Sequence, residues 1–279
     1  MGNRISRCVE LLEQDQAIYY DGPHSGHVLT RAQGRIDAAT WADYMNVGME
    51  HGAFDMAGLA EYMQGMVDAG PTRSGHRTPT VIVEAPVNGI DAAHVRYNAW
   101  QFRQLLGRGV HGILLCQAES ADAAGRRLLG IGTRGRGSES TAAPIWGLST
   151  EEYMERCDPW PLNPKGELLL GVKLESPEGI ANCEAILAVP GIGFAELGPG
   201  DLGLALGYLA VPRDPYPAEM KEARERVFAA CRKNHIPFLE TCSPENIVAK
   251  LDEGVRVIAG HREETAKIGR LHQRRTMPV

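Results

Sequence analysis

The chain has 279 residues, a net charge of -6 and six cysteines spread along its length. This length suits one barrel-sized domain, which can bury enough apolar surface to fold without disulfides or a structural metal. Lys and Arg are dispersed in an acidic chain and no run of about 20 apolar residues is present, so we expect neither nucleic acid nor membrane as a partner. Because it lacks an apolar leader, we expect a cytoplasmic protein with reduced thiols that acts on small molecules.

Short β-rich runs alternate with amphipathic stretches along the whole sequence, the pattern of parallel strands joined by crossover helices. There are eight such runs, and eight parallel strands close a (β/α)8 TIM barrel. We therefore predict this α/β fold for one domain over residues 1–279. In chain order the predicted strands are Ala17–Tyr20, Asp43–Val47, Thr80–Val83, Gly112–Leu115, Leu168–Leu174, Gly193–Leu197, Ile236–Leu239 and Val255–Ala259.

Three of the intervening stretches carry apolar residues at the three- and four-residue spacing of a helix. They are Ala57–Ala69, His94–Leu106 and Glu219–Asn234. Residues 130–147 are rich in Gly, Ser and Thr, and we predict a long loop there.

Charged side chains follow the ends of most predicted strands. In a barrel these ends converge on one mouth, where catalytic groups are found. Each such residue alone is typical of a solvated loop, but together they concentrate negative potential that a bound cation would relieve. The residues are Glu50, His51, Glu84, Glu119, Glu175, Asp201, Glu240 and His261.

Carboxylates in this arrangement favour a hard divalent metal with oxygen ligands, Mg2+, Mn2+ or Co2+. A zinc site is disfavoured because no His or Cys cluster has the customary spacing. His24 and His27 lie in a Gly- and Pro-containing stretch, and we interpret them as exposed rather than as ligands. No organic cofactor is expected.

Two stretches, V-K-L-E-S-P-E-G at residues 172–179 and E-L-G-P-G-D-L-G at residues 196–203, resemble the HpcH/HpaI aldolase and citrate lyase family. The resemblance runs from about Asp43 to Thr265. It implies that Glu175 and Asp201 bind the metal. It also implies cleavage of a 4-hydroxy-2-oxo acid or related carboxylate to pyruvate and an aldehyde, as in the breakdown of aromatic compounds. Family members are usually homo-oligomeric barrels (dimer, trimer or hexamer) that exchange a C-terminal helix between subunits.

Further positions match the family's site. The segment G-M-E-H at residues 48–51 resembles D-G-E-H, which implies that His51 is the acid/base with Glu50 beside it. Arg134 lies in G-T-R-G-R-G-S, which resembles the G-I-R-G loop and implies a catalytic role for this arginine. The substrate carboxylate would be bound around Gly198, Pro199 and Gly200, with backbone N–H groups of Gly200 and Asp201 as donors because proline has none.

Glu119 lies in C-Q-A-E-S, which resembles the P-K-x-E-S segment of the citrate-lyase-like branch. We predict that Glu119 is a substrate-binding residue that either supports the metal ligands or serves as a third ligand.

The sequence departs from the family at three points. The strand-three arginine of V-R-V-P is Glu84 here, in V-E-A-P, and Gly48 and Gly107 stand where acidic residues are usual. Loss of such an oxyanion donor costs about 3 to 4 kcal/mol in a typical enzyme. Two interpretations of Glu84 remain open: an ion pair with an arginine such as Arg134 or Arg136, or a direct role as acid or base.

Three functions are compatible with these residues. The first is a metal-dependent carbon-carbon lyase acting on an aromatic or aliphatic substrate. The second is a decarboxylase, dehydratase or isomerase that acts on a non-pyruvate carboxylate. It is suggested by the negative charge of Glu84 where the family has a positive one. The third is a carboxylate-binding relative without catalysis.

Overall fold

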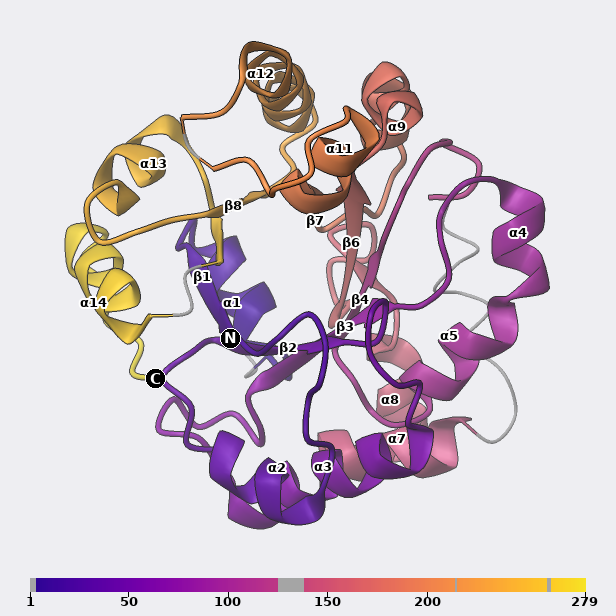
Figure 1. The fold of residues 1–279 in the computed structure, drawn as a ribbon. Coiled ribbons are helices and arrows are strands. Elements are labelled where there is room, and N and C mark those ends of the chain that lie inside the picture. Colours follow the sequence, from indigo (N-terminus) through magenta and orange to yellow (C-terminus); the bar gives the residue numbers. More distant parts are fainter. Residues whose placement is uncertain (1–3, 125–137, 214, 260–261) are drawn as a thin grey trace.

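The computed structural model describes residues 4–124, 138–213, 215–259 and 262–279. Parallel strands form a closed barrel with helices around its outside (Figure 1). Each barrel strand pairs with the next in the chain, and the last pairs with the first. The strands are β1 (Ile18–Asp21), β2 (Tyr44–Gly48), β3 (Thr80–Ala85), β4 (Gly112–Leu115), β6 (Leu168–Leu174), β7 (Phe194–Leu197), β8 (Phe238–Thr241) and β9 (Val257–Ala259).

The predicted (β/α)8 barrel is thus confirmed. The bounds of β4 and β6 are those expected, and each of the other strands differs by one or two residues at one or both ends. The sequence did not indicate the short strand β5 (Pro159–Trp160), which pairs with the N-terminal end of β6.

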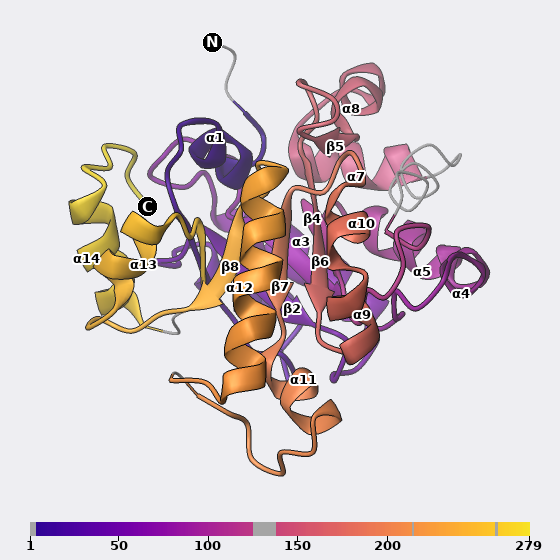
Figure 2. The same ribbon diagram turned by 90° about the horizontal axis from the view of Figure 1, so that it is seen from above.

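Helices cover the barrel and close its N-terminal end. Figure 2 shows the barrel from the side, with α1 at one end and α11 at the other. The helices are α1 (Arg7–Glu13), α2 (Arg31–Asp37), α3 (Met56–Ala69), α4 (Ala92–Tyr97), α5 (Ala99–Leu106), α7 (Ser138–Trp146), α8 (Thr150–Arg156), α9 (Pro177–Ala181), α10 (Cys183–Leu187), α11 (Pro199–Ala205), α12 (Ala218–Lys233), α13 (Ile247–Glu253) and α14 (Glu263–His272).

Two expectations about helices were wrong. The single helix predicted over His94–Leu106 is divided into α4 and α5 at Asn98, whose side chain donates to the backbone oxygen of His94. The long loop predicted over residues 130–147 contains helix α7. The indole Nε1 of Trp146 donates to the backbone oxygen of Gly109 at 2.8 Å, so burial of this aromatic residue holds the helix against the barrel.

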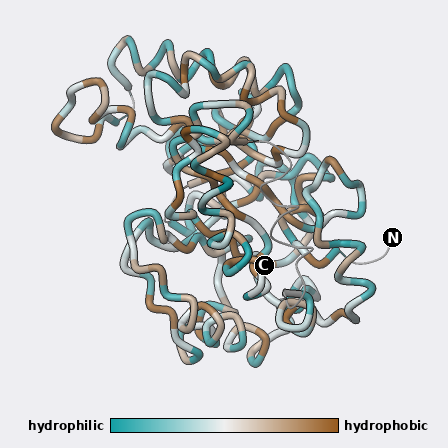
Figure 3. Tube along the Cα trace, turned by 90° about the vertical axis from the view of Figure 1, so that its right-hand side faces the viewer, coloured by the Kyte–Doolittle hydropathy of each residue, from teal (hydrophilic) through white to brown (hydrophobic). Residues whose placement is uncertain are grey.

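Side chains alternate between the barrel interior and the helices, as strand geometry requires. On β6, Leu169 packs inside with Phe194 of β7, whereas Leu168 and Leu170 face the outer helices. Apolar stretches run through the middle of the molecule in Figure 3, where the strands lie. Continuing this alternation toward the C-terminal end places residue 173 and residue 175 inside the barrel as well.

Helix α14 lies beside α13 on the barrel of its own chain (Figure 1). Its exchange between subunits needs a partner chain and stays a prediction. Among the described residues, no helix has the length and apolarity needed to span a membrane.

Candidate active site

An open cavity of about 280 Å³ lies at the C-terminal ends of the strands. It brings together a large part of the predicted site. Of the predicted residues, the cavity is lined by His51, Glu175, Gly198, Pro199, Gly200 and Asp201. It is also lined by His24, Lys173 and Glu196, for which the sequence indicated no role at the site.

Among the described residues, Lys173 is a cation at the centre of this cavity. Its side chain points into the barrel from β6, and Nζ donates to Glu50 Oε2 at 2.8 Å. Nζ also lies 3.8 Å from Glu84 Oε1 and 4.0 Å from Glu175 Oε2. The negative potential that the sequence predicts at the mouth is therefore partly balanced by the protein itself.

The protonation of Lys173 follows from its surroundings. Burial works to lower the pKa of Lys173, but Cys116 and the carboxylates of Glu196, Glu175 and Glu84 outweigh it and raise that pKa. Lys173 is thus an ammonium group, a form that cannot attack a carbonyl as a nucleophile.

Glu84 is buried behind the cavity wall rather than facing the cavity. Its side chain is 1% exposed, and Oε1 lies 2.7 Å from His24 Nδ1. Burial works to raise the pKa of Glu84, but the hydrogen bond to His24 and the charge of Lys173 lower it below its usual value. Among the described residues, Glu84 is therefore a carboxylate in contact with His24 and Lys173. The sequence suggested Arg134 as an ion-pair partner. That arginine lies outside the described residues, as does Arg136.

His24 reaches Glu84 because the loop after β1 packs tightly on the end of β2. The N–H of Gly48 donates to the backbone oxygen of Pro23 at 3.2 Å. A Cβ on Gly48 would lie 1.9 Å from the backbone oxygen of His24. The glycine that stands where the family has an acidic residue thus leaves room for this loop.

His51 lines the same cavity in a more open setting. Its side chain is 52% exposed, and Nε2 lies 3.6 Å from Glu50 Oε2 and 3.9 Å from Asp201 Oδ2. Both distances exceed that of a hydrogen bond. Gly107, where the family has an acidic partner for this histidine, caps the C-terminal end of α5.

Two groups of side chains could hold a metal ion. Glu50, Cys116 and Glu175 form one, and Glu50, His51 and Asp201 form the other, each with possible ligand atoms within 4.8 Å of one another. Within the described part of the chain, no such group contains both Glu175 and Asp201. Glu50 belongs to both groups, so it lies near both Glu175 and Asp201, the two metal ligands that the sequence predicts.

The buried carboxylates of these groups fit a hard cation. Glu175 accepts the backbone N–H of Gln117 at 2.8 Å, and burial raises its pKa to about 9 despite the nearby Lys173. Among the residues that the structure describes, Glu50 Oε1 is buried without a hydrogen-bond partner. Because unsatisfied buried oxygens are costly and Mg2+ or Mn2+ prefers oxygen ligands, a divalent ion beside Glu175 and Glu50 would stabilise both side chains.

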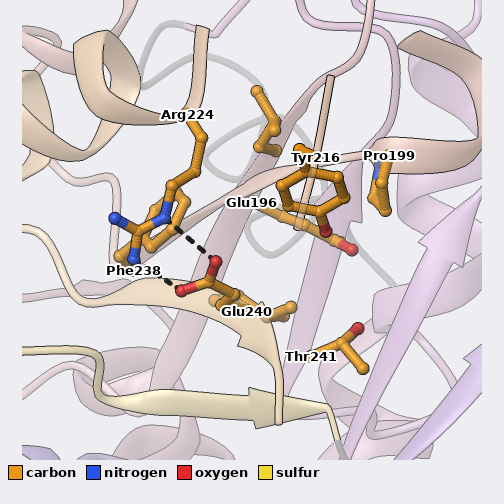
Figure 4. A pocket seen from close by; sticks show the side chains of 9 residues that line it. Glu196, Pro199, Tyr216, Arg224, Phe238, Glu240 and Thr241 are labelled. Atoms are coloured by element: carbon orange, nitrogen blue, oxygen red, sulfur yellow. Dashed lines mark hydrogen bonds and ion pairs between the residues drawn. The ribbon is translucent and has the colours of Figure 1, made fainter. Parts of the chain in front are cut away.

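Glu119 and Glu240 do not line the cavity. Glu119 accepts the hydroxyl of Ser176, the N-cap of α9, at 2.7 Å, and therefore supports the segment next to Glu175. Glu240 points away from the barrel interior to Arg224, which donates from Nε at 3.0 Å and from Nη2 at 2.7 Å (Figure 4). The eighth expected charge at the mouth, His261, lies outside the described residues.

The barrel, its acidic mouth and the buried carboxylates together place a candidate metal-binding site at the C-terminal face. The sequence model of the HpcH/HpaI aldolase/citrate lyase family matches residues 94–259. Since this is more than half of the chain, the protein belongs to that family. The prediction of a lyase of the class II aldolase type agrees with the family and with its aldolase-named relatives.

One curated relative is the hydroxypyruvate/pyruvate aldolase of Pseudomonas aeruginosa, 29% identical over 194 residues, or 67% of this chain and 63% of that protein. The chain spans less than two thirds of the length of the first curated relatives it matches, 46% and 63%.

Among solved structures, an HpcH/HpaI family protein from Burkholderia cenocepacia has a TM-score of 0.66 at 18% identity and covers 96% of both chains. The citrate lyase beta subunit of M. tuberculosis, complexed with oxaloacetate and magnesium, has a TM-score of 0.56 at 15% identity over 93% of this chain and 97% of that one. These likenesses show the shared fold.

Proposed function

We propose that the protein is a divalent-metal-dependent carbon-carbon lyase that cleaves a 4-hydroxy-2-oxo acid, or a related carboxylate, to pyruvate and an aldehyde. The observation that carries this proposal is the pair of buried carboxylates, Glu175 and Glu50, beside the turn that starts α11. The names of the aldolase relatives support the same reaction class.

In this proposal Glu175 and Asp201 hold the metal, with Glu50 between them. The ion, when bound, would act as a Lewis acid that stabilises the negative charge developing on the substrate. Gly198 makes room for this arrangement, since a Cβ there would lie 2.2 Å from Glu175 Oε2.

The turn at the start of α11 would bind the substrate carboxylate. A Cβ on Gly200 would meet nothing within 4 Å, so its backbone borders open space. The N–H groups of Gly200 and Asp201 can donate to an anion, whereas Pro199 has no N–H and instead fixes the first turn.

Glu84, which replaces the family's arginine on β3, is compatible with a pyruvate enolate in the cavity. His24 and Lys173 line the cavity, and Glu84 lies behind them. A ligand would therefore meet the ammonium group of Lys173 where the family has arginine, which favours the lyase over the decarboxylase, dehydratase or isomerase alternative. Arg134 stays a candidate from the resemblance alone.

The proposal is tested by proton NMR of pyruvate in D2O with the purified protein and Mg2+, Mn2+ or Co2+, following loss of the methyl signal. We expect metal-dependent exchange, lowered at least about 100-fold in Glu175→Ala and Asp201→Ala because charge stabilisation is lost. Glu184→Ala, which removes an exposed carboxylate on α10, serves as the control.

Full activity in both site variants would refute the metal mechanism. Absence of exchange with every metal, from a folded and metal-loaded protein, would rule out pyruvate as the nucleophile. Tight metal binding without turnover of any carboxylate on a broad panel would instead support the non-catalytic alternative.

A further inference from the structure

Cleavage of a 4-hydroxy-2-oxo acid, the reaction proposed above, requires two proton movements. A base takes the hydroxyl proton at C4, and the C3–C4 bond breaks with its electron pair entering the enolate of pyruvate. A proton then returns to C3 to give the methyl group, and the aldehyde leaves. Such a base works best when a second group fixes the orientation and tautomer of its ring.

His51, which the resemblance implies for this task, lacks a partner of that kind at hydrogen-bond distance in the described structure. Its nearest carboxylate oxygens, on Glu50 and Asp201, are 3.6 and 3.9 Å away. Glu50 is in turn engaged by Lys173 at 2.8 Å. His51 is thus an exposed ring that belongs to one of the two candidate metal-binding groups.

His24 has the geometry that His51 lacks. Its Nδ1 lies 2.7 Å from a carboxylate oxygen of Glu84, while the ring lines the cavity. Since Nδ1 is engaged by Glu84, proton exchange with a ligand falls to Nε2. We infer that His24, held by Glu84, is the acid/base of this site and takes the place that the resemblance gives to His51.

The three departures from the family pattern then belong to one arrangement. Gly48 leaves room for the loop that carries His24, and Glu84 supplies the carboxylate that orients the His24 ring. An acidic residue at position 107 is not required, because in this arrangement His51 is not the acid/base. Lys173, 3.8 Å from Glu84, keeps that carboxylate ionised.

The charged groups that face His24 set the pH range in which it acts. The hydrogen bond to Glu84 is the largest influence and raises the pKa of His24, burial lowers it, the charges of Glu84 and Glu196 raise it, and Lys173 lowers it. Removing the charge of Glu84 should therefore lower the pH at which His24 becomes a base.

The experiment compares His24→Gln, His51→Gln and Glu84→Gln as metal-loaded proteins, measuring aldehyde release and exchange of the pyruvate methyl protons. We expect His24→Gln to lower kcat by about 100- to 10,000-fold, as loss of an acid/base does, and His51→Gln by less than about tenfold. Ser25→Ala, in the same loop, is the matched control. Manganese content and oxalate binding show that each variant keeps its site.

Glu84→Gln provides a second measurement that does not depend on the fold of His24→Gln. The rising limb of its kcat/KM profile should move to lower pH than in the wild type, a shift that a merely structural role would not produce. An unchanged limb overturns the assignment, as does a loss in His51→Gln equal to or larger than that in His24→Gln. A wild type with no cleavage and no exchange overturns the proposed function and this inference together, whereas an active wild type with the opposite ranking overturns the inference alone.

Discussion

At the scale of single residues, two glycines determine what the site can contain. A Cβ on Gly198 would lie 2.2 Å from Glu175 Oε2 and 2.8 Å from Glu175 Cβ. A Cβ on Gly48 would meet the backbone of His24. Neither glycine has a positive φ, so both are required by close approach rather than by backbone conformation.

Gly198→Ala should therefore weaken metal binding without removing any ligand. The added methyl group must displace Glu175, and misplacing a ligand or its support typically costs about 10- to 100-fold in metal affinity. Isothermal titration with Mn2+ measures the effect, and Leu204→Ala, an exposed position on the same helix, is the control. Equal affinity in Gly198→Ala and the wild type would show that Glu175 is not held in this way.

The residues that the sequence indicated and those it missed differ in how they reach the site. Glu175 and Asp201 sit in motifs that can be recognised locally. Lys173 could have been found as well, because a residue two positions before an inward-facing one on a strand also points inward. His24 could not, since its position depends on how a loop packs against Gly48 of another strand.

At the scale of elements, the alternation of side chains along a strand places Glu84 and Glu240 on opposite faces of the barrel, although both were predicted to lie at the mouth. Glu84 and Glu240 both stand near the C-terminal end of a strand, yet Glu84 points into the barrel and Glu240 toward Arg224 and Lys250. The sequence could not tell these faces apart, because strands of a parallel barrel are apolar on both sides, as Phe238 and Leu239 show.

Substitution of the two glutamates should give opposite results. Glu240→Gln weakens a buried ion pair, so we expect the free energy of unfolding to fall by about 3 kcal/mol. Its kcat should stay within about twofold of the wild type, whereas Glu84→Gln should lower kcat. Urea unfolding and steady-state kinetics measure both effects. Loss of kcat without loss of stability in Glu240→Gln would place that residue at the active site after all.

At the scale of the whole molecule, the two ends of the barrel carry opposite arrangements of charge. Among the described residues, the mouth surrounds Lys173 with carboxylates, whereas the base surrounds the buried Asp43 with arginines. Asp43 lies 2.8 Å from Arg275 Nη1, 3.5 Å from Arg270 Nη2 and 3.7 Å from Arg7 Nη1. These arginines come from both ends of the chain, so no local pattern in the sequence could indicate the cluster.

Asp43→Asn should be among the more destabilising single changes in this protein. It leaves several buried arginine side chains without their shared counter-charge, and breaking a buried pair in this way costs about 3 to 5 kcal/mol. Asp15→Asn is the matched control, because Asp15 is 80% exposed and its pair with Arg256 should contribute at most about 1 kcal/mol. Urea unfolding of the three proteins measures the difference.

Because Asp43 is at the opposite end of the barrel from the mouth, the folded fraction of Asp43→Asn should retain its kcat. Similar losses of stability in both variants would mean that the arginines at the base are neutralised by solvent rather than by Asp43.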